Sequence, residues 1–362
     1  MHVPFCRTKC DYCGFFSQTD LRPADAFVSR LQTEARLRAS PRDLFGTLYV
    51  GGGTPTVLRG GLLEELISSL RAAQPLSAEA EVTVEANPDD VTPGLLHGLR
   101  QVGVNRLSIG VQSFRDEELR CLGRRHTADQ ARAAIGMARD AGVTNLSLDL
   151  MYGFRGQRRD QWLQSLEEAV AWRPEHLSCY QLSIESDTPL GRRVASGTLA
   201  KAPESKEHAF FLATSQFLTA RGYEHYEVSN FALPGFRSRH NGLYWQRTPY
   251  VGLGPSAHSF DGTRRWWNVR SVEDYDAALR RNRLPVAGSE RLTEEQARLE
   301  CRMLGFRTDA GVPIPLLVTS PLGVAALERL EAQGLVTLRD GRAVPTLRGM
   351  AIADHLPLEF AS

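Results

Sequence analysis

The stretch Thr47-Leu48-Tyr49-Val50-Gly51-Gly52-Gly53-Thr54 joins a short apolar run to three glycines, which is typical of a β-strand that ends in a tight turn. Apolar residues then recur at helical spacing over residues 61–72. The same alternation continues along the chain, with β-like runs at 81–84, 105–109, 145–150, 176–183 and 224–228, and helical patterns from Thr92 and over 128–141, 160–171 and 204–221. We therefore predict an α/β fold in which a parallel sheet, open or closed into a barrel, carries helices on its outside.

Polar residues follow the predicted strands at the points where the strands end. They are the glycine tract with Thr54, then Glu85, Gln112, Asp149 and the run 183–185. In barrels and open α/β sheets the functional site lies at the carboxyl ends of the strands. A single acidic residue after a strand could equally serve a turn or a surface salt bridge. A glycine tract and several polar residues at one topological position indicate a shared site.

The composition is that of an ordinary globular chain of 362 residues, with 42% hydrophobic and 23% charged residues. A net charge of +1 argues against binding nucleic acid or anionic lipid over a broad surface. No run approaches the roughly 18 apolar residues of a membrane span, and the amino terminus lacks the basic leader and apolar core of a signal peptide. We expect a cytoplasmic protein, in which clustered cysteines bind metal rather than form disulfides.

The character of the chain changes after residue 228. Residues 229–268 are rich in glycine, proline and aromatic residues, and we expect an ordered, loop-rich extension with a function of its own. Helical patterns return near Thr293 and at 324–333, and a short strand pattern covers 335–338. We therefore expect three parts: the sheet-and-helix part at 1–228, the extension at 229–285, and a small helical, winged-helix-like domain at 286–362.

Three of the six cysteines lie within the first 13 residues, with the spacing Cys6-x3-Cys10-x2-Cys13. One interpretation is a helix that buries three small residues on one face, but Pro4, Gly14 and the polar residues between the cysteines favour a loop. A structural zinc site needs four protein ligands, and His2 could be the fourth. Three thiolates on a [4Fe–4S] cluster would instead leave one iron open, as a catalytic metal site requires. The remaining cysteines are scattered, and we expect them to pack as small hydrophobic residues: Cys121, Cys179 and Cys301.

With Tyr12 before the last cysteine, the CxxxCxxC spacing resembles the radical S-adenosylmethionine superfamily. The resemblance implies a partial (β/α)6 barrel, similar to the TIM barrel, with a [4Fe–4S] cluster on the three cysteines. It also implies that S-adenosylmethionine binds the open iron, where an electron from the cluster cleaves the sulfonium. Carboxylates suit ribose hydroxyls, and arginine can hold a carboxylate in a fork. The cofactor contacts that the resemblance implies are Gly52, Gly53, Thr54, Glu85, Gln112, Arg124 and Asp149.

The resemblance extends to about Ser259 and is to the family of the heme chaperone HemW. The motifs that carry it are EANP (85–88), RLSIGVQSF (106–114), LGRRH (122–126), LDLMYGF (148–154) and YEVSNFALPGFRSRHNGLYW (226–245). The family is related to the oxygen-independent coproporphyrinogen III oxidase, which has a further cysteine where this chain has Phe15. Oxidative decarboxylation of coproporphyrinogen III is therefore the less favoured alternative, and a radical enzyme acting on another substrate is a third hypothesis.

The family resemblance also implies that the chain binds heme and delivers it to heme-accepting respiratory proteins. The element concerned is HNxxYW, residues 240–245, in which His240 is a candidate axial ligand of the iron. Tyr244 and Trp245 could pack on the macrocycle, while the alternative is a structural aromatic corner with a hydrogen-bonded histidine. Related chains carry a further strand before the cysteines, so we expect the first strand to be nearly missing here. A homodimer is compatible with the sequence.

Overall fold

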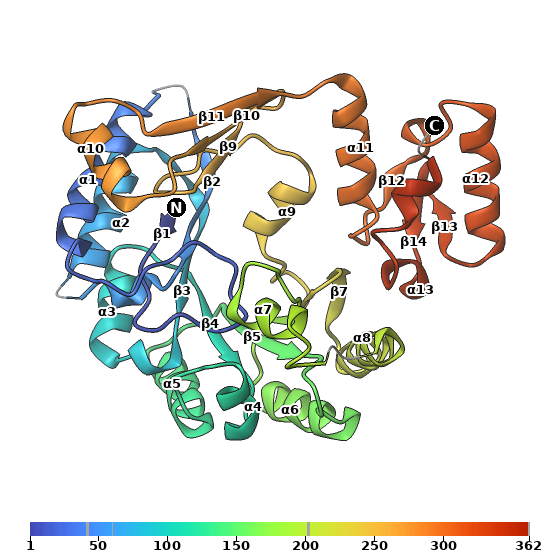
Figure 1. The fold of residues 1–362 in the computed structure, drawn as a ribbon, viewed down its shortest axis with the longest axis horizontal. Coiled ribbons are helices and arrows are strands. Elements are labelled where there is room, and N and C mark those ends of the chain that lie inside the picture. The colour runs from blue at the N-terminus through green and yellow to red at the C-terminus, as the bar shows by residue number, and fades with distance from the viewer. Residues whose placement is uncertain (41–42, 60, 201–202, 361–362) are drawn as a thin grey trace.

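The main element of the computed structural model, which describes residues 1–40, 43–59, 61–200 and 203–360, is one eight-stranded sheet. The strand order is β1-β2-β3-β4-β5-β6-β8-β7, and Figure 1 shows the sheet curved, with helices along its outer side. The first six strands are parallel: β1 (His2–Val3), β2 (Phe45–Gly52), β3 (Leu76–Ala86), β4 (Arg106–Gln112), β5 (Leu146–Tyr152) and β6 (His176–Gln181). The predicted fold class, a partial (β/α)6 barrel, is confirmed.

Helices on the outer side follow most of these strands. They are α1 (Ala24–Leu37), α2 (Leu62–Ala73), α3 (Pro93–Gln101), α4 (Asp116–Cys121), α5 (Ala128–Asp140), α6 (Arg159–Ala171) and α8 (Glu204–Thr219). The predicted start of α3 is confirmed, because Thr92 accepts a hydrogen bond from the Leu95 backbone N–H and Pro93 takes the first helical position. Thr127 and Gln130 form a capping box at the start of α5.

The last β segment does not continue the parallel series, which corrects the prediction for residues 224–228. β7 (Glu224–Glu227) and β8 (Asn230–Ala232) form an antiparallel hairpin, and β8 pairs antiparallel with β6. Only two residues separate these strands, and a connection that short forces the chain to turn back on itself. The sheet consequently extends past residue 228, to Ala232.

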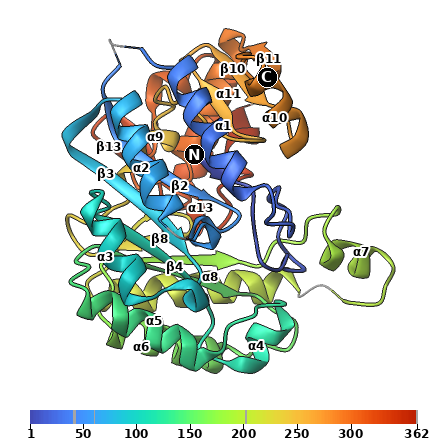
Figure 2. The same cartoon turned by 90° about the vertical axis from the view of Figure 1, so that its left-hand side faces the viewer.

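The later segments lie beside the barrel. α7 (Pro189–Ala195) stands out from the body (Figure 2). A second sheet contains β9 (His258–Phe260), β10 (Arg264–Asn268) and β11 (Val286–Arg291), and α9 (Arg239–Trp245) and α10 (Val272–Arg280) belong to the same region. The C-terminal part has its own core and consists of α11 (Glu294–Gly305), β12 (Val312–Pro313), α12 (Pro321–Ala332), β13 (Val336–Arg339), β14 (Arg342–Pro345) and α13 (Leu347–Met350).

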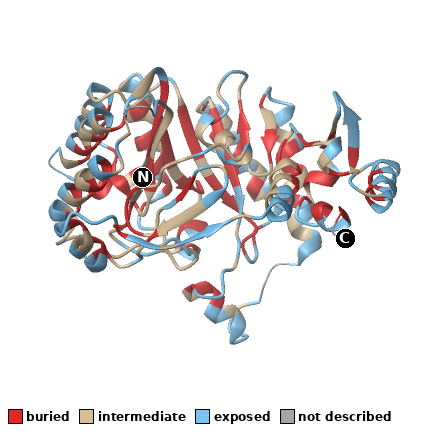
Figure 3. Ribbon diagram, turned by 90° about the horizontal axis from the view of Figure 1, so that it is seen from above, coloured by how far each residue is buried: buried red, intermediate tan, exposed pale blue. Residues whose placement is uncertain are grey.

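The two faces of the curved sheet differ in polarity. On β3, Val82 and Val84 alternate with Thr83 and Glu85, and the two valines are buried. Buried strands fill the centre of the molecule in Figure 3. The concave face, which we call the lumen, instead carries polar side chains that hydrogen bond across neighbouring strands, such as Ser108 with Asp149 and Ser147 with His176. No helix in the described ranges is long and apolar enough to cross a membrane.

Glu34 of α1 joins the barrel to the extension. It is fully buried, and its carboxylate accepts hydrogen bonds from Tyr275 Oη (2.7 Å), Asn268 Nδ2 (2.7 Å), the Gly254 backbone N–H (2.8 Å) and Arg38 Nε (2.8 Å). A buried carboxylate is tolerated only when it is paired and hydrogen-bonded in this way. α1 and residues 254–275 are therefore held as one unit.

We predict that Glu34→Ala lowers the free energy of unfolding by about 3–5 kcal/mol, because it leaves the buried charge of Arg38 without its carboxylate and the donors of Tyr275 and Gly254 without their acceptor. Urea denaturation followed by circular dichroism measures the change. Glu167→Ala, on the exposed face of α6, is the matched control and should cost less than about 0.5 kcal/mol. Equal effects of the two substitutions would contradict the assignment.

Candidate functional site

The loop that carries the three cysteines is fastened to the glycine tract by backbone hydrogen bonds. The N–H of Gly53 donates to the carbonyl of Val3 (2.7 Å), and the N–H of Thr54 donates to the carbonyl of Phe5 (2.7 Å). A Cβ atom at Gly53 would lie 2.6 Å from the Phe5 oxygen and 3.0 Å from Cys6 Sγ, so only glycine permits this approach. Cys6 Sγ consequently lies 3.5 Å from Thr54 Oγ1.

The cysteines occupy an irregular loop between β1 and α1, not a helix, so the interpretation of a shared helical face is wrong. All three thiols are free and partly exposed. Burial raises the pKa of the Cys13 thiol, and the neighbouring Cys10 and Cys6 raise it further. Among the described residues no three His, Cys, Asp or Glu side chains converge on a single metal position. A cubane cluster does not need such convergence, because each thiolate binds a different iron.

His2 does not act with the cysteines as a fourth zinc ligand. Its Nε2 lies 2.9 Å from the carbonyl oxygen of Phe16, and burial lowers the pKa of the imidazole to about 4. The ring packs where a side chain on Gly52 would otherwise lie, and Gly52 has a φ of +115°. The zinc alternative therefore lacks its proposed fourth ligand.

Arg124 connects the cysteine loop to the strand ends. Its Nη1 lies 3.6 Å from Cys10 Sγ, and its Nη2 donates to Asn87 Oδ1 (2.6 Å) and to the carbonyl of Gly110 (2.9 Å). Asn87 Nδ2 in turn donates to Thr54 Oγ1 (3.2 Å). Arg124 therefore joins Cys10 of the loop to Asn87 and Gly110 at the ends of β3 and β4. The Arg124 Nε is buried without a hydrogen-bond partner.

Glu85 and Asp149 lie on the lumen side of β3 and β5. The hydroxyl of Tyr49 donates to Glu85 Oε1 (2.7 Å), and the N–H of Gly52 donates to Glu85 Oε2 (3.2 Å). Burial raises the pKa of Glu85 to about 7, and the nearby Asp149 carboxylate adds to the shift. Burial also raises the pKa of Asp149, which accepts a hydrogen bond from Ser108 Oγ (3.1 Å).

Gln112 ends β4 with a φ of +66°, which is uncommon for a residue with a side chain. The position of a Cβ atom on Gly110 lies 3.0 Å from Gln112 Nε2 and 3.3 Å from Arg124 Nη2. Gln112 and Arg124 therefore meet next to Gly110. Through this series of contacts the structure brings the cysteine loop, the glycine tract, Glu85, Gln112 and Arg124 to one edge of the sheet. Asp149 lies in the middle of β5 on the lumen side and is hydrogen-bonded to Ser108.

The HNxxYW element lies elsewhere, near the amino-terminal halves of β2 and β3. The backbone N–H groups of Arg239 and His240 both donate to the Glu81 carboxylate (3.0 Å each). His240 Nδ1 lies 2.8 Å from Thr47 Oγ1, and Nε2 lies 3.1 Å from Tyr244 Oη. Burial lowers the pKa of His240 to about 3, and the chain's terminal amino group adds to the shift, so the imidazole is neutral.

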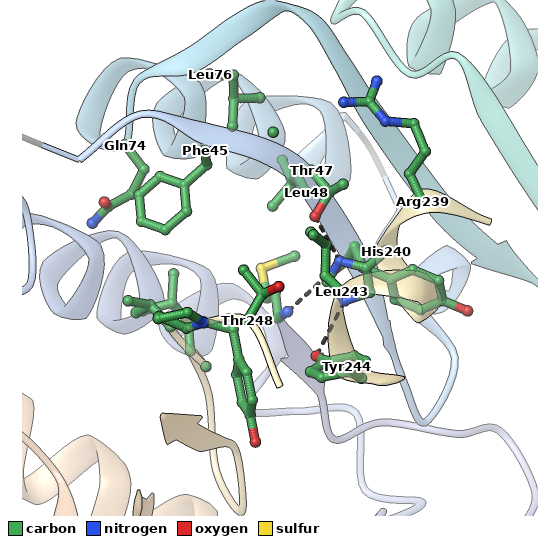
Figure 4. A pocket seen from close by; sticks show the side chains of 18 of the residues that line it. Phe45, Thr47, Leu48, Gln74, Leu76, Arg239, His240, Leu243, Tyr244 and Thr248 are labelled. Carbon is green, nitrogen blue, oxygen red and sulfur yellow. Dashed lines mark hydrogen bonds between the residues drawn. The ribbon is translucent and has the colours of Figure 1, made fainter. Parts of the chain in front are cut away.

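His240 and Tyr244 line a cavity of about 290 Å³, shown in Figure 4. The other lining side chains are mostly apolar or aromatic and include Phe45, Leu48, Leu76, Leu243 and Tyr250. Tyr244 is 41% exposed. Trp245 does not line this cavity, and its indole Nε1 is buried without a hydrogen-bond partner.

Sequence reasoning missed Asn87 and Tyr49. Asn87 stands in the EANP motif, where it bridges Thr54 and Arg124. Tyr49 follows Thr47 by two residues on β2. Because side chains alternate between the two faces of a strand, both lie on the lumen side. That alternation is the signal that could have identified Tyr49.

A curved sheet of six parallel strands with a three-cysteine loop at its carboxyl edge is the architecture of a radical S-adenosylmethionine protein, and residues 1–169 match the model of the Radical SAM superfamily. The chain is 38% identical to the heme chaperone HemW of Mycobacterium tuberculosis (strain ATCC 25618 / H37Rv), over 98% of this chain and 92% of that one. It is 35% identical to the heme chaperone HemW of Bacillus subtilis (strain 168), over 86% and 83% of the two chains. The chain therefore belongs to the heme chaperone HemW family.

The fold is also that of a solved oxidase. The structure of coproporphyrinogen III oxidase (HemN) from Escherichia coli superposes with a TM-score of 0.84, over 99% of this chain and 88% of that one. The sequence identity is 23%, so this likeness concerns the fold alone.

We predict that serine in place of Cys6, Cys10 or Cys13 abolishes reconstitution of the cluster, because each thiolate would bind one iron. Iron and sulfide content after anaerobic reconstitution measures this. Cys301→Ala, on α11, is the control and should keep full content. Full content in any of the three serine variants would remove that cysteine from the ligand set.

The raised pKa of Glu85 predicts a pH-dependent effect of Glu85→Gln. Between its ordinary pKa of 4.5 and about 7, the folded chain holds a proton at Glu85 that the unfolded chain has released. The contribution of Glu85 to the free energy of unfolding therefore falls as pH rises through this range. Glu85→Gln should be more stable than the unsubstituted protein at pH 8, by about 3 kcal/mol, and by less than about 1 kcal/mol at pH 5.

Urea denaturation of the protein without cofactors at the two pH values measures this difference. Glu167→Gln controls for the substitution itself. A stability difference for Glu85→Gln that does not change with pH would contradict the raised pKa.

Proposed function

We propose that this chain is a heme chaperone that binds heme with the aid of a [4Fe–4S] cluster and S-adenosylmethionine. The observation that carries the proposal is the 38% identity to a heme chaperone HemW over 98% of the chain, a span that reaches well beyond the barrel. A likeness confined to the superfamily match at residues 1–169 would not have distinguished a chaperone from a radical enzyme.

The residues at the carboxyl edge fit the two resident cofactors. Three free, partly exposed thiols beside a guanidinium suit an iron–sulfur cluster with one open iron. The buried, unpaired Nε of Arg124 could serve a carboxylate, and Glu85 and Asp149 could accept from ribose hydroxyls. In this proposal Gly52, Gly53 and Thr54 bind the methionine part, and Gln112 lies alongside. When bound, the cluster would supply an electron for chemistry at the sulfonium.

Heme would bind at the cavity beside α9, with His240 as an axial ligand. The neutral imidazole is the form that binds iron, and the cavity wall is largely apolar. Nε2 would have to leave Tyr244 Oη, while Nδ1 would continue to donate to Thr47 Oγ1 and hold the ring. Tyr244 and Trp245 remain candidates for packing on the macrocycle.

Oxidative decarboxylation of coproporphyrinogen III is the second candidate, because the fold is that of the oxidase. The position two residues after Cys13 weighs against it. Phe15 stands there in place of a cysteine, and its side chain is 69% exposed at the surface of the loop. The chain therefore lacks the fourth thiol expected of the oxidase.

Several further features belong to this proposal. The chaperone would deliver heme to respiratory proteins and would work in the cytoplasm, where free thiols stay reduced. We also propose that the chain is divided into three parts, residues 1–228, 229–285 and 286–362. A homodimer is the proposed assembly. The separate core around Phe306 and Phe360 supports an independent C-terminal domain.

We predict that His240→Ala raises the Kd for hemin at least about tenfold, equivalent to about 1.4 kcal/mol, and shifts the Soret band, because an iron ligand is lost. Optical titration of the reconstituted protein under anaerobic conditions measures both. His208→Ala, exposed on α8, is the matched control and should bind as the unsubstituted protein does. An unchanged Kd and Soret spectrum for His240→Ala would remove this histidine as the ligand.

A further inference from the structure

Tyr49 lies between the two proposed sites and contacts both. Its ring stacks on the imidazole of His240, with the centroids 4.9 Å apart and the planes at 20°. It also lines the cavity beside α9. On the other side, its hydroxyl donates to Glu85 Oε1 at 2.7 Å.

The contacts continue from Glu85 to the glycine tract. The second carboxylate oxygen of Glu85 accepts from the N–H of Gly52 at 3.2 Å. His240, Tyr49, Glu85 and Gly52 therefore form an unbroken path from the cavity to the edge that carries the cysteine loop. No other tyrosine hydroxyl in the described residues has a hydrogen bond to Glu85.

We propose that Tyr49 is a positioning residue that couples heme binding at His240 to S-adenosylmethionine binding at Glu85 and Gly52. The inference rests on the proposed function, since it requires both ligands. In this proposal Tyr49 is not required for binding heme or S-adenosylmethionine separately. It makes the affinity for one ligand depend on whether the other is bound.

The sign of the coupling follows from the charge of the cofactor. S-adenosylmethionine is a cation, and a cation near Glu85 favours the ionised carboxylate, which accepts a stronger hydrogen bond than the neutral acid. The pKa of Glu85, about 7, leaves this carboxyl partly neutral without the cofactor. Burial and the Glu85 carboxylate raise the pKa of Tyr49 well above its ordinary value, so its hydroxyl stays a donor.

A stronger bond to Glu85 fixes the Tyr49 ring, and that ring is the surface on which the imidazole of His240 rests. With Thr47 on Nδ1, the imidazole is then held on two sides and pre-organised for iron. S-adenosylmethionine should therefore tighten heme binding. Because coupling between two binding sites is reciprocal, heme should tighten S-adenosylmethionine binding by the same factor.

The test titrates hemin into the reconstituted full-length protein, anaerobically, with and without saturating S-adenosylmethionine. For the unsubstituted protein we expect the Kd for hemin to fall about fivefold or more when the cofactor is present. Tyr49→Phe keeps the ring and removes only the hydroxyl. This variant should still bind both ligands, but its Kd for hemin should be nearly the same with and without S-adenosylmethionine. Tyr223→Phe is the matched control, because it removes a buried tyrosine hydroxyl that donates to the carbonyl of Pro174 (2.7 Å) and does not line the cavity. It should retain the ratio of the unsubstituted protein.

Titration of S-adenosylmethionine with and without hemin gives the reciprocal ratio on the unsubstituted protein and needs no variant. A ratio of one in the unsubstituted protein, with both ligands bound, would overturn the coupling while leaving the proposed function intact. Retention of the full ratio in Tyr49→Phe would also overturn the role of Tyr49. Failure of the unsubstituted protein to bind hemin at all would overturn the proposed function, and the coupling with it.

Discussion

The candidate site depends on the pairing of a two-residue strand with a glycine turn. β1 contains only His2 and Val3, yet its pairing with Gly51 and Gly52 on β2 continues in the backbone bonds of Gly53 and Thr54 to the cysteine loop. Side chains at these glycines would collide with Glu85, with His2 or with the loop itself. The absence of side chains from residues 51–53 therefore brings a loop of free thiols against the carboxyl ends of the parallel strands.

The polar lumen would let one barrel hold the two proposed sites. Polar side chains line the concave face, from Thr47 on β2 and Glu81 on β3 to Glu85 and Asp149 further along β3 and β5. α9 closes against this face through Glu81, and the cysteine loop closes against the strand ends. The proposed heme site and the proposed cofactor site are therefore separated along the strands, and Tyr49 is the side chain that touches both.

Local patterns predicted most of the fold. The periods of strands and helices are local properties, and the predicted segments at 81–84, 128–141 and 160–171 all correspond to elements of the expected type. The predicted parallel direction of residues 224–228 was wrong. The direction of this strand is set by the two-residue connection to β8, and the residue pattern of the strand itself carries no information on that connection. α1 was not predicted, although Phe27, Val28, Leu31 and Ala35 share one buried face.

The site was predictable in part for the same reason. The cysteines and the glycine tract have characteristic short spacings, and strand-end positions follow from the strands. The position of His240 could not be predicted, because its partner Thr47 is 193 residues away and only the packing of α9 brings them together. Tyr49 belongs to no recognisable sequence motif, and its proposed role depends on the hydrogen bond to Glu85 on the neighbouring strand.

The most direct test of the chaperone account is anaerobic incubation of the reconstituted protein with coproporphyrinogen III, S-adenosylmethionine and a reductant, followed by analysis of the tetrapyrroles. The account predicts that coproporphyrinogen III is recovered unchanged, while the same preparation binds hemin stoichiometrically. Formation of protoporphyrinogen would contradict the account, because it would show the oxidase reaction despite Phe15 in the position of the fourth cysteine.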